Sequence, residues 1–129
     1  MNNMASNAGN LAGRILIATL FLMAGLGKLG GGYASTQAYM EATGVPGVLL
    51  PLVIALEIGG AILVITGFWT RTSALALAAF SILSAVLFHW DFSDQTQQVM
   101  LLKNVAIAGG FLLLASTGAG TWSVDGRCA

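Results

Sequence analysis

The chain has 129 residues, of which 57% are hydrophobic and only 8% are charged, and its formal net charge is zero. An average soluble domain is about 25% charged, and a chain this short buries only about 60–70% of its surface in its own core. The composition therefore excludes an ordinary soluble globular protein and predicts an integral membrane protein. The lack of net positive charge offers nothing for nucleic-acid binding.

Four apolar segments are long enough to cross a bilayer, which takes roughly 17–25 helical residues. In chain order they are expected at 11–29, 48–67, 72–89 and 99–117. Residues 1–10 precede them as a polar N-terminal tail, 11–122 form one four-helix transmembrane domain, and 123–129 form a C-terminal tail. The predicted fold class is all-α, a four-helix transmembrane bundle.

The connections between these segments carry turn and helix-start signals. Three glycines at 30–32 predict the end of the first helix, and 36–43 predicts a short helix before the second span. Asp94 or Ser93 is the expected N-cap of the fourth helix, because both side chains accept hydrogen bonds from a first helical turn.

Arginines predict the orientation of the bundle. An even number of spans places both termini on one side of the membrane, together with Arg14, Arg71 and Arg127. Since Lys and Arg are enriched in cytoplasmic loops, both termini are expected in the cytoplasm. Trp69 and Trp122 are expected at the membrane interface on this side.

Glu57 lies near the middle of the second apolar segment. An ionised carboxylate at that depth costs roughly 2.5 kcal/mol or more, so it needs a partner or a proton. Lys28, Lys103 and Arg14 all have stems long enough to reach a buried carboxylate from another turn. The sequence does not choose among these three bases.

Side chains from all four segments converge on the half of the bundle away from the termini. They are Lys28, Glu57, His89, Lys103 and Asn104. One interpretation is an internal ion-pair clamp that holds the helices in register. Another is a polar pocket for a quinone headgroup or a small anion, in which Lys or His donates to an oxygen and a carboxylate or imidazole relays a proton. A third is an ion or proton pathway.

Other redox chemistry has little support in these residues. One histidine cannot provide bis-histidine haem ligation, and no metal-ligand spacing is present. The single cysteine, Cys128, cannot form an intramolecular disulfide. No catalytic residue and no metal site are therefore assigned.

Short motifs that combine a polar or charged residue with small residues follow one another in a characteristic order. They are RILIA at 14–18, FLMAGLGKL at 21–29, EIGG at 57–60 with Gly67 and Arg71, His89-Trp90, and Lys103-Asn104 with Gly109-Gly110. In order and spacing these motifs resemble the DoxX family of small four-helix membrane proteins, over about residues 10–125.

The resemblance implies a redox-linked role in the bacterial inner membrane. Some relatives form the small membrane subunit of a thiosulfate:quinone oxidoreductase, and others are linked to membrane oxidoreductase complexes. We therefore expect a membrane subunit or anchor of a quinone-linked complex, in contact with lipid, an oxidoreductase partner and other copies of itself. The alternative is a non-enzymatic transporter, scaffold or assembly factor. Catalysis by this chain alone is not expected.

The resemblance also implies which polar residues belong to the family pattern. The candidates for ligand binding or proton relay are Lys28, Glu57, His89, Lys103 and Asn104, and the candidates for structural charges are Arg14 and Arg71.

Overall fold

Helices make up nearly all of the molecule. A computed structural model of the chain describes residues 3–128, and the side chains of residues 4–127. The elements are α1 (Asn3–Gly27), α2 (Gly31–Ala42), the 3-10 turn η1 (Gly47–Leu49), α3 (Leu50–Thr66), α4 (Thr70–Phe88), α5 (Gln95–Thr117) and α6 (Val124–Cys128). No strand occurs in the described part of the chain, and the predicted all-α class is confirmed.

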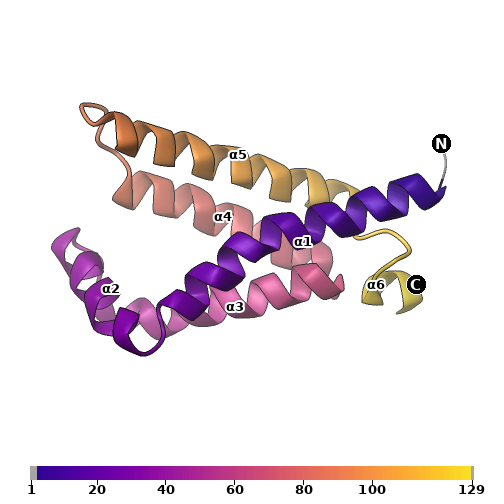
Figure 1. The fold of residues 1–129 in the computed structure, drawn as a ribbon, viewed down its shortest axis with the longest axis horizontal. Helices are drawn as coiled ribbons and strands as arrows, with labels where there is room; N and C mark the ends of the chain where they lie inside the picture. The colour runs from indigo at the N-terminus through magenta and orange to yellow at the C-terminus, as the bar shows by residue number, and fades with distance from the viewer. Residues whose placement is uncertain (1–2, 129) are drawn as a thin grey trace.

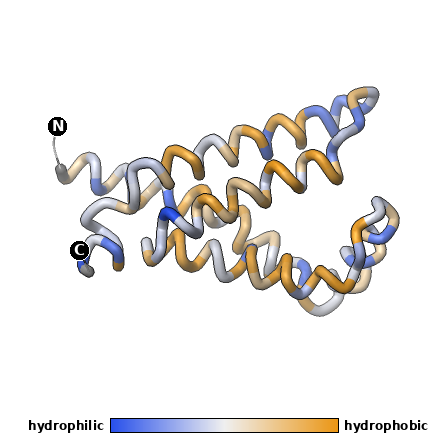
Figure 2. The backbone as a smooth tube through the Cα atoms, turned by 180° about the vertical axis from the view of Figure 1, so that it is seen from behind, coloured by the Kyte–Doolittle hydropathy of each residue, from blue (hydrophilic) through white to orange (hydrophobic). Residues whose placement is uncertain are grey.

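Four of these helical segments are long and apolar enough to cross a membrane. They are Met4–Gly27, Gly47–Thr66, Thr70–Phe88 and Gln95–Thr117. Figure 2 shows hydrophobic residues along the long helices and hydrophilic residues gathered at their ends. Large apolar side chains such as Leu16 and Leu113 are at least 70% exposed. A surface of this kind is suited to lipid, and the prediction of four spans is confirmed.

The spans pack as two pairs. α1 lies chiefly against α3, and α4 lies chiefly against α5, while α3 and α4 join the two pairs. Figure 1 shows both termini at one end of the bundle, here called the termini end, and α2 projecting at the other, the α2 end. Where the pairs meet, Phe21 of α1 packs edge-on against Phe111 of α5, with 5.5 Å between ring centroids.

The first helix begins and ends earlier than expected. α1 starts at Asn3, so the predicted helix start at residue 11 is wrong, and Met1 and Asn2 lie outside the described residues. Its polar first turns persist because Asn7 and Asn10 hydrogen-bond to the C-terminal segment. α1 ends at Gly27, before the three glycines, two of which begin α2.

Two helix ends show the expected local chemistry. Asp94 caps α5, as predicted, and its carboxylate accepts from the Thr96 N–H at 2.9 Å. Gly67 ends α3 with a left-handed φ of 72°. A Cβ at Gly67 would lie only 2.3 Å from the Ser123 Cβ and 2.7 Å from Arg14 Nη1, so this position needs glycine both for its conformation and for space.

Gly25 allows α1 to approach α3 closely, and we expect Gly25→Ala to destabilise the bundle by about 1–3 kcal/mol through overpacking. An added Cβ would lie 2.6 Å from Ile58 Cγ1 and 3.2 Å from the Glu57 Cβ. The free energy of unfolding in mixed micelles, measured by titration with a denaturing detergent, tests this. Gly27→Ala is the matched control, because its added Cβ meets nothing within 4 Å. Equal stability of the two variants would contradict close packing at Gly25.

Candidate functional site

A salt bridge between α1 and α3 lies toward the α2 end. Lys28 Nζ, just after the end of α1, is 2.7 Å from Glu57 Oε1 in α3. It also donates to Ala24 O at 3.4 Å. This is the one salt bridge that the described side chains form. Among the three bases considered from sequence, Lys28 is therefore the partner of Glu57, and neither Lys103 nor Arg14 is.

The two ends of this salt bridge differ in exposure. The Glu57 side chain is 4% exposed, whereas that of Lys28 is 23% exposed. An ammonium has three N–H donors, of which Lys28 gives one to the short bond with Glu57 and one to the longer bond with Ala24 O. Glu57 Oε2 accepts no hydrogen bond from a described residue. The pair therefore neutralises the buried carboxylate while its ammonium remains partly accessible.

His89 lies at the same end of the bundle but makes a separate contact. Its Nδ1 is 2.7 Å from Gln97 Oε1, a bond that joins the end of α4 to the start of α5. With that oxygen as acceptor, the neutral ring carries its proton on Nδ1 and leaves Nε2 as an acceptor. Beside it, Phe88 stacks on Tyr39 of α2 with 5.4 Å between ring centroids.

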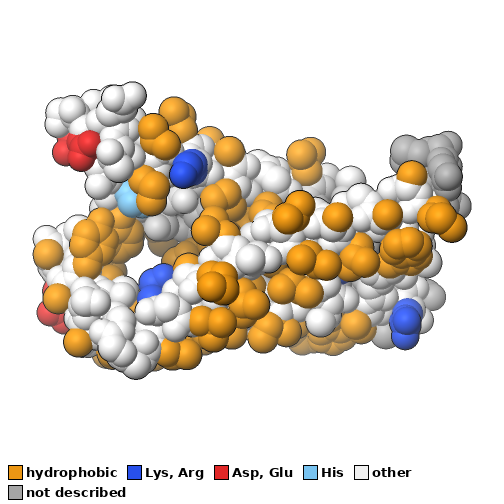
Figure 3. Space-filling view, in the orientation of Figure 1, with side chains coloured by type: hydrophobic (Ala, Val, Ile, Leu, Met, Phe, Trp, Pro, Cys, Tyr) orange, Lys and Arg blue, Asp and Glu red, His pale blue; other side chains and the backbone are white. Residues whose placement is uncertain are grey.

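The remaining two candidates lie on α5. Lys103 is exposed and Asn104 is half-buried. Neither side chain forms a hydrogen bond or salt bridge with another described residue. Figure 3 shows that the molecule is hollowed at the α2 end, with a Lys or Arg side chain and a histidine side chain beside the opening. The structure therefore joins only Lys28 and Glu57 directly among the five residues predicted to converge.

Arg14 occupies the opposite end and is 1% exposed. Its Nε donates to Asn10 Oδ1 at 2.7 Å, and its Nη2 donates to Trp122 O at 2.5 Å. Its Nη1 donates to Ile65 O at 2.8 Å and to Val64 O at 3.3 Å. Both carbonyls belong to the last turn of α3, where Val64 O also accepts from the Gly67 N–H and Ile65 O accepts from no described backbone N–H. Arg14 thus ties α1 to the end of α3 and to the C-terminal segment.

Asp125 completes this polar network and was not singled out from sequence. Its two carboxylate oxygens accept from the backbone N–H groups of Trp69 and Thr70, each at 2.9 Å. Its own N–H donates to Gly67 O at 2.8 Å. A carboxylate is stabilising at the positive N-terminal end of a helix, and Asp125 supplies it to α4 from a distant part of the chain.

The surroundings of Asp125 act on its titration in opposite directions. Burial by itself raises the pKa of this carboxyl, but hydrogen bonds from Thr70 and Trp69, with the positive charge of Arg14, hold the pKa below its usual range. The Thr70 hydroxyl contributes to this lowering, although it falls short of hydrogen-bond geometry.

The lowered pKa of Asp125 predicts acid-sensitive docking of the C-terminal segment. A depressed folded-state pKa stabilises the docked form above the unfolded pKa, and this contribution is lost as the pH falls through the folded value. We expect the protection of the Trp69 and Thr70 amides from hydrogen exchange, relative to their intrinsic rates at each pH, to fall below about pH 4, the ordinary range of Asp. Asp125→Asn should show fast exchange already at neutral pH. If Asp125→Asn still loses its amide protection below about pH 4, a group other than Asp125 causes the loss.

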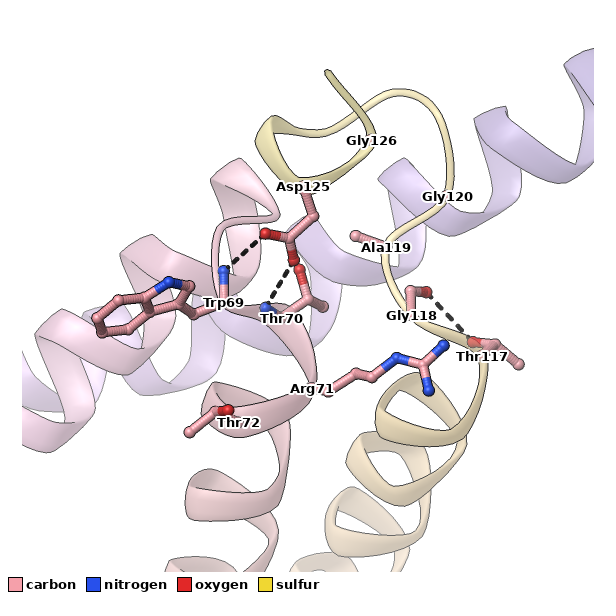
Figure 4. A pocket seen from close by; sticks show the side chains of 10 residues that line it. All are labelled: Trp69, Thr70, Arg71, Thr72, Thr117, Gly118, Ala119, Gly120, Asp125 and Gly126. Carbon is pink, nitrogen blue, oxygen red and sulfur yellow. Dashed lines mark hydrogen bonds between the residues drawn. The ribbon is translucent and has the colours of Figure 1, made fainter. Parts of the chain in front are cut away.

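Arg71 lies near Asp125 but makes different contacts. It is exposed, and it lines an open pocket together with the start of α4, the end of α5 and the C-terminal segment, as Figure 4 shows. As for metal sites, no group of three or more His, Cys, Asp or Glu side chains that could hold an ion occurs among the described residues.

Comparison with known proteins settles the family. A sequence model described as DoxX matches residues 9–90. The chain belongs to the DoxX family. The matched region of this DoxX protein includes Arg14, Lys28, Glu57 and His89, and it ends before Lys103.

Two relatives resemble the DoxX chain along most of their length. The inner membrane protein YqjF of Escherichia coli (strain K12) is 54% identical, over 92% of this chain and 91% of the relative. The inner membrane protein YphA of the same organism is 37% identical, over 91% of this chain and 88% of the relative. No solved structure matches the chain.

Proposed function

We propose that this DoxX protein is an inner-membrane subunit of a quinone-linked redox complex, and that Lys28 binds a carbonyl oxygen of the quinone headgroup. The observation that supports this most is the unequal exposure of the salt bridge, with Glu57 buried and Lys28 23% exposed. The carboxylate orients an ammonium that donates to Glu57 and Ala24 and has one N–H left for a ligand.

The chemistry would be shared with a partner. Reduction of a quinone to a quinol takes two electrons and two protons, and the electrons would come from an associated oxidoreductase. Lys28 would polarise one carbonyl oxygen by a charge-assisted hydrogen bond. After Lys28 gives a proton to the reduced oxygen, a proton from water would replace it at the exposed side of Lys28, either directly or through Glu57, which would first take that proton up. His89 Nε2 would be a second acceptor on the proton path. This chain would bind and orient the quinone headgroup and supply the protons.

The proposed location is the bacterial inner membrane, with both termini in the cytoplasm. Both relatives are named inner membrane proteins. At the termini end, Arg71 and Arg127 are exposed and can follow the positive-inside rule, whereas Arg14 is buried and contributes less to it. A reporter fused after Ala129 that is active only in the cytoplasm tests the orientation, and activity of a periplasm-specific reporter would reverse it.

Quinone binding is tested by titrating the purified protein in nanodiscs with a ubiquinone analogue, with quenching of tryptophan fluorescence as the readout. We expect saturable binding of the analogue by the parent protein. Lys28→Met should weaken this binding about tenfold, because it removes one charge-assisted hydrogen bond. Lys103→Met is the matched control and should bind as the parent does, because Lys103 lies outside the salt bridge. Unsaturable quenching, or equal affinity of both variants, would contradict the proposal.

A second candidate is a non-enzymatic scaffold in which the salt bridge is purely structural. It is favoured by the short 2.7 Å bond and by the 4% exposure of Glu57, which closes on its partner rather than on an open cavity. The scaffold predicts that a variant lacking both charges keeps its function as well as its fold. The charge-exchange series described in the Discussion separates the two candidates.

A further inference from the structure

The pocket at the termini end has opposite charges on its two sides. It is an open pocket of about 400 Å³ between the α3–α4 turn, the end of α5 and the C-terminal segment. Arg71 lies on one side and Asp125 on the other, with Thr70 at the start of α4 between them (Figure 4). Neither charged side chain belongs to a salt bridge within the described residues.

The guanidinium of Arg71 has no polar partner among the described residues. Its Nε and Nη2 lie 3.3 Å from the position that a Cβ on Gly118 would occupy, so the group lies over the glycine that follows α5. It donates no hydrogen bond to a described residue. A planar guanidinium with five N–H donors matches the oxygens of a phosphate group.

Asp125 and Thr70 form the other side of the pocket. Each oxygen of Asp125 accepts one backbone N–H, and an ionised carboxylate has room for further donors. The Thr70 hydroxyl is buried and has no hydrogen-bond partner, which is rare for a buried polar group. An ammonium placed against the carboxylate would supply such a further donor.

The position of the pocket along the bundle restricts its ligand. Thr70 begins the span α4 and Thr117 ends the span α5, and both line the pocket. The ends of spanning helices lie at the level of lipid headgroups. At this end Trp69 is 64% exposed and Trp122 is 44% exposed, as in the aromatic belts of membrane proteins.

We infer that the pocket binds the zwitterionic headgroup of an amine-bearing phospholipid, with its phosphate on Arg71 and its primary ammonium on Asp125. A purely anionic headgroup would place its charge against the Asp125 carboxylate. A choline headgroup has no N–H to donate to that carboxylate. Phosphoethanolamine chemistry is complementary to both sides, and the inference does not depend on quinone binding at the other end.

The test is lipid retention by the purified protein, measured by native mass spectrometry after equilibration with equal amounts of phosphatidylethanolamine, phosphatidylcholine and phosphatidylglycerol. We expect phosphatidylethanolamine to be retained about tenfold more than either competitor, because one additional charge-assisted contact corresponds to about a tenfold gain in affinity. Equal retention of the three lipids would overturn the inference, and so would preference for phosphatidylglycerol.

Two variants assign the retention to the pocket. Arg71→Gln should lower the retention of phosphatidylethanolamine about tenfold, because it removes the phosphate contact. Arg127→Gln, which removes an exposed charge at the same end but outside the pocket lining, should leave that retention unchanged. Unchanged helix content by circular dichroism confirms that Arg71→Gln is folded. Equal behaviour of the two variants would overturn the assignment. Displacement of the lipid by an equal concentration of soluble glycerophosphoethanolamine would show that the ligand is a soluble ester, not a lipid.

Discussion

Replacing Arg14 by methionine is expected to lower the free energy of unfolding by about 3 kcal/mol or more, since each hydrogen bond from a charged group contributes roughly 1.5–3 kcal/mol. The substitution removes the donors for Ile65 O and Trp122 O, at 2.8 Å and 2.5 Å. It leaves these carbonyls without a partner in a region where water is scarce. Methionine has a similar stem, so packing changes less than hydrogen bonding.

The Arg14 variant should also release the C-terminal segment. Trp122 O is the contact through which Arg14 holds that segment against the helix ends. Unfolding in mixed micelles measures the stability loss, and amide exchange over residues 118–125 measures the release. Arg71→Gln is the control, because that exposed arginine hydrogen-bonds to no described residue, and its effect should stay within about 0.5 kcal/mol. An Arg14→Met protein as stable as this control would contradict the structural role of Arg14.

The second large effect concerns Lys28 and Glu57. Lys28→Met leaves a buried carboxylate unpaired, which costs about 3–5 kcal/mol in a fully buried pair. Because the Lys28 side chain is 23% exposed, we discount the expected loss for solvent screening to about 2 kcal/mol. Glu57→Gln should cost less, since the amide oxygen still accepts from the ammonium. The double variant Lys28→Met/Glu57→Gln should recover most of the stability, because no buried charge remains.

Lys103→Met/Glu57→Gln is the matched control for this series. Lys103 makes no contact with Glu57, so that pair should be additive within about 0.5 kcal/mol, whereas Lys28 and Glu57 should be coupled. Additive effects of Lys28 and Glu57 would contradict the 2.7 Å salt bridge. If the stable double variant still binds the ubiquinone analogue, Lys28 does not hold the quinone and the salt bridge is structural. If the variant is stable but binding is lost, the proposed role of Lys28 in quinone binding is favoured.

Local chemistry was enough to predict several elements. The apolar run lengths placed the four spans, and the Asp94 side chain marked the start of α5. The cost of charge in a bilayer was enough to require a partner for Glu57. Predictions of this kind succeed because helix propensity, capping and burial depend on neighbours within a few residues.

The polar networks were less predictable because their contacts are long-range. Asn10 and Arg14 are four residues apart, a spacing that places both on one helix face, and this was a usable signal for their hydrogen bond. Asp125 offered no comparable signal, because its partners Trp69 and Thr70 are more than 50 positions away. Asp125 lies in a short polar segment after the last span, and from the sequence that segment resembled an ordinary C-terminal tail.

By itself the sequence determined a four-span membrane protein of the DoxX pattern, with a buried carboxylate that had to be neutralised. Only the tertiary structure decided that Lys28 neutralises it, that Arg14 serves the opposite end, and that Lys103 is left exposed. The physical reason is that all three bases have stems of sufficient reach. The choice among them depends on how the helices pair, and the close approach of α1 to α3 at Gly25 brings Lys28 to Glu57.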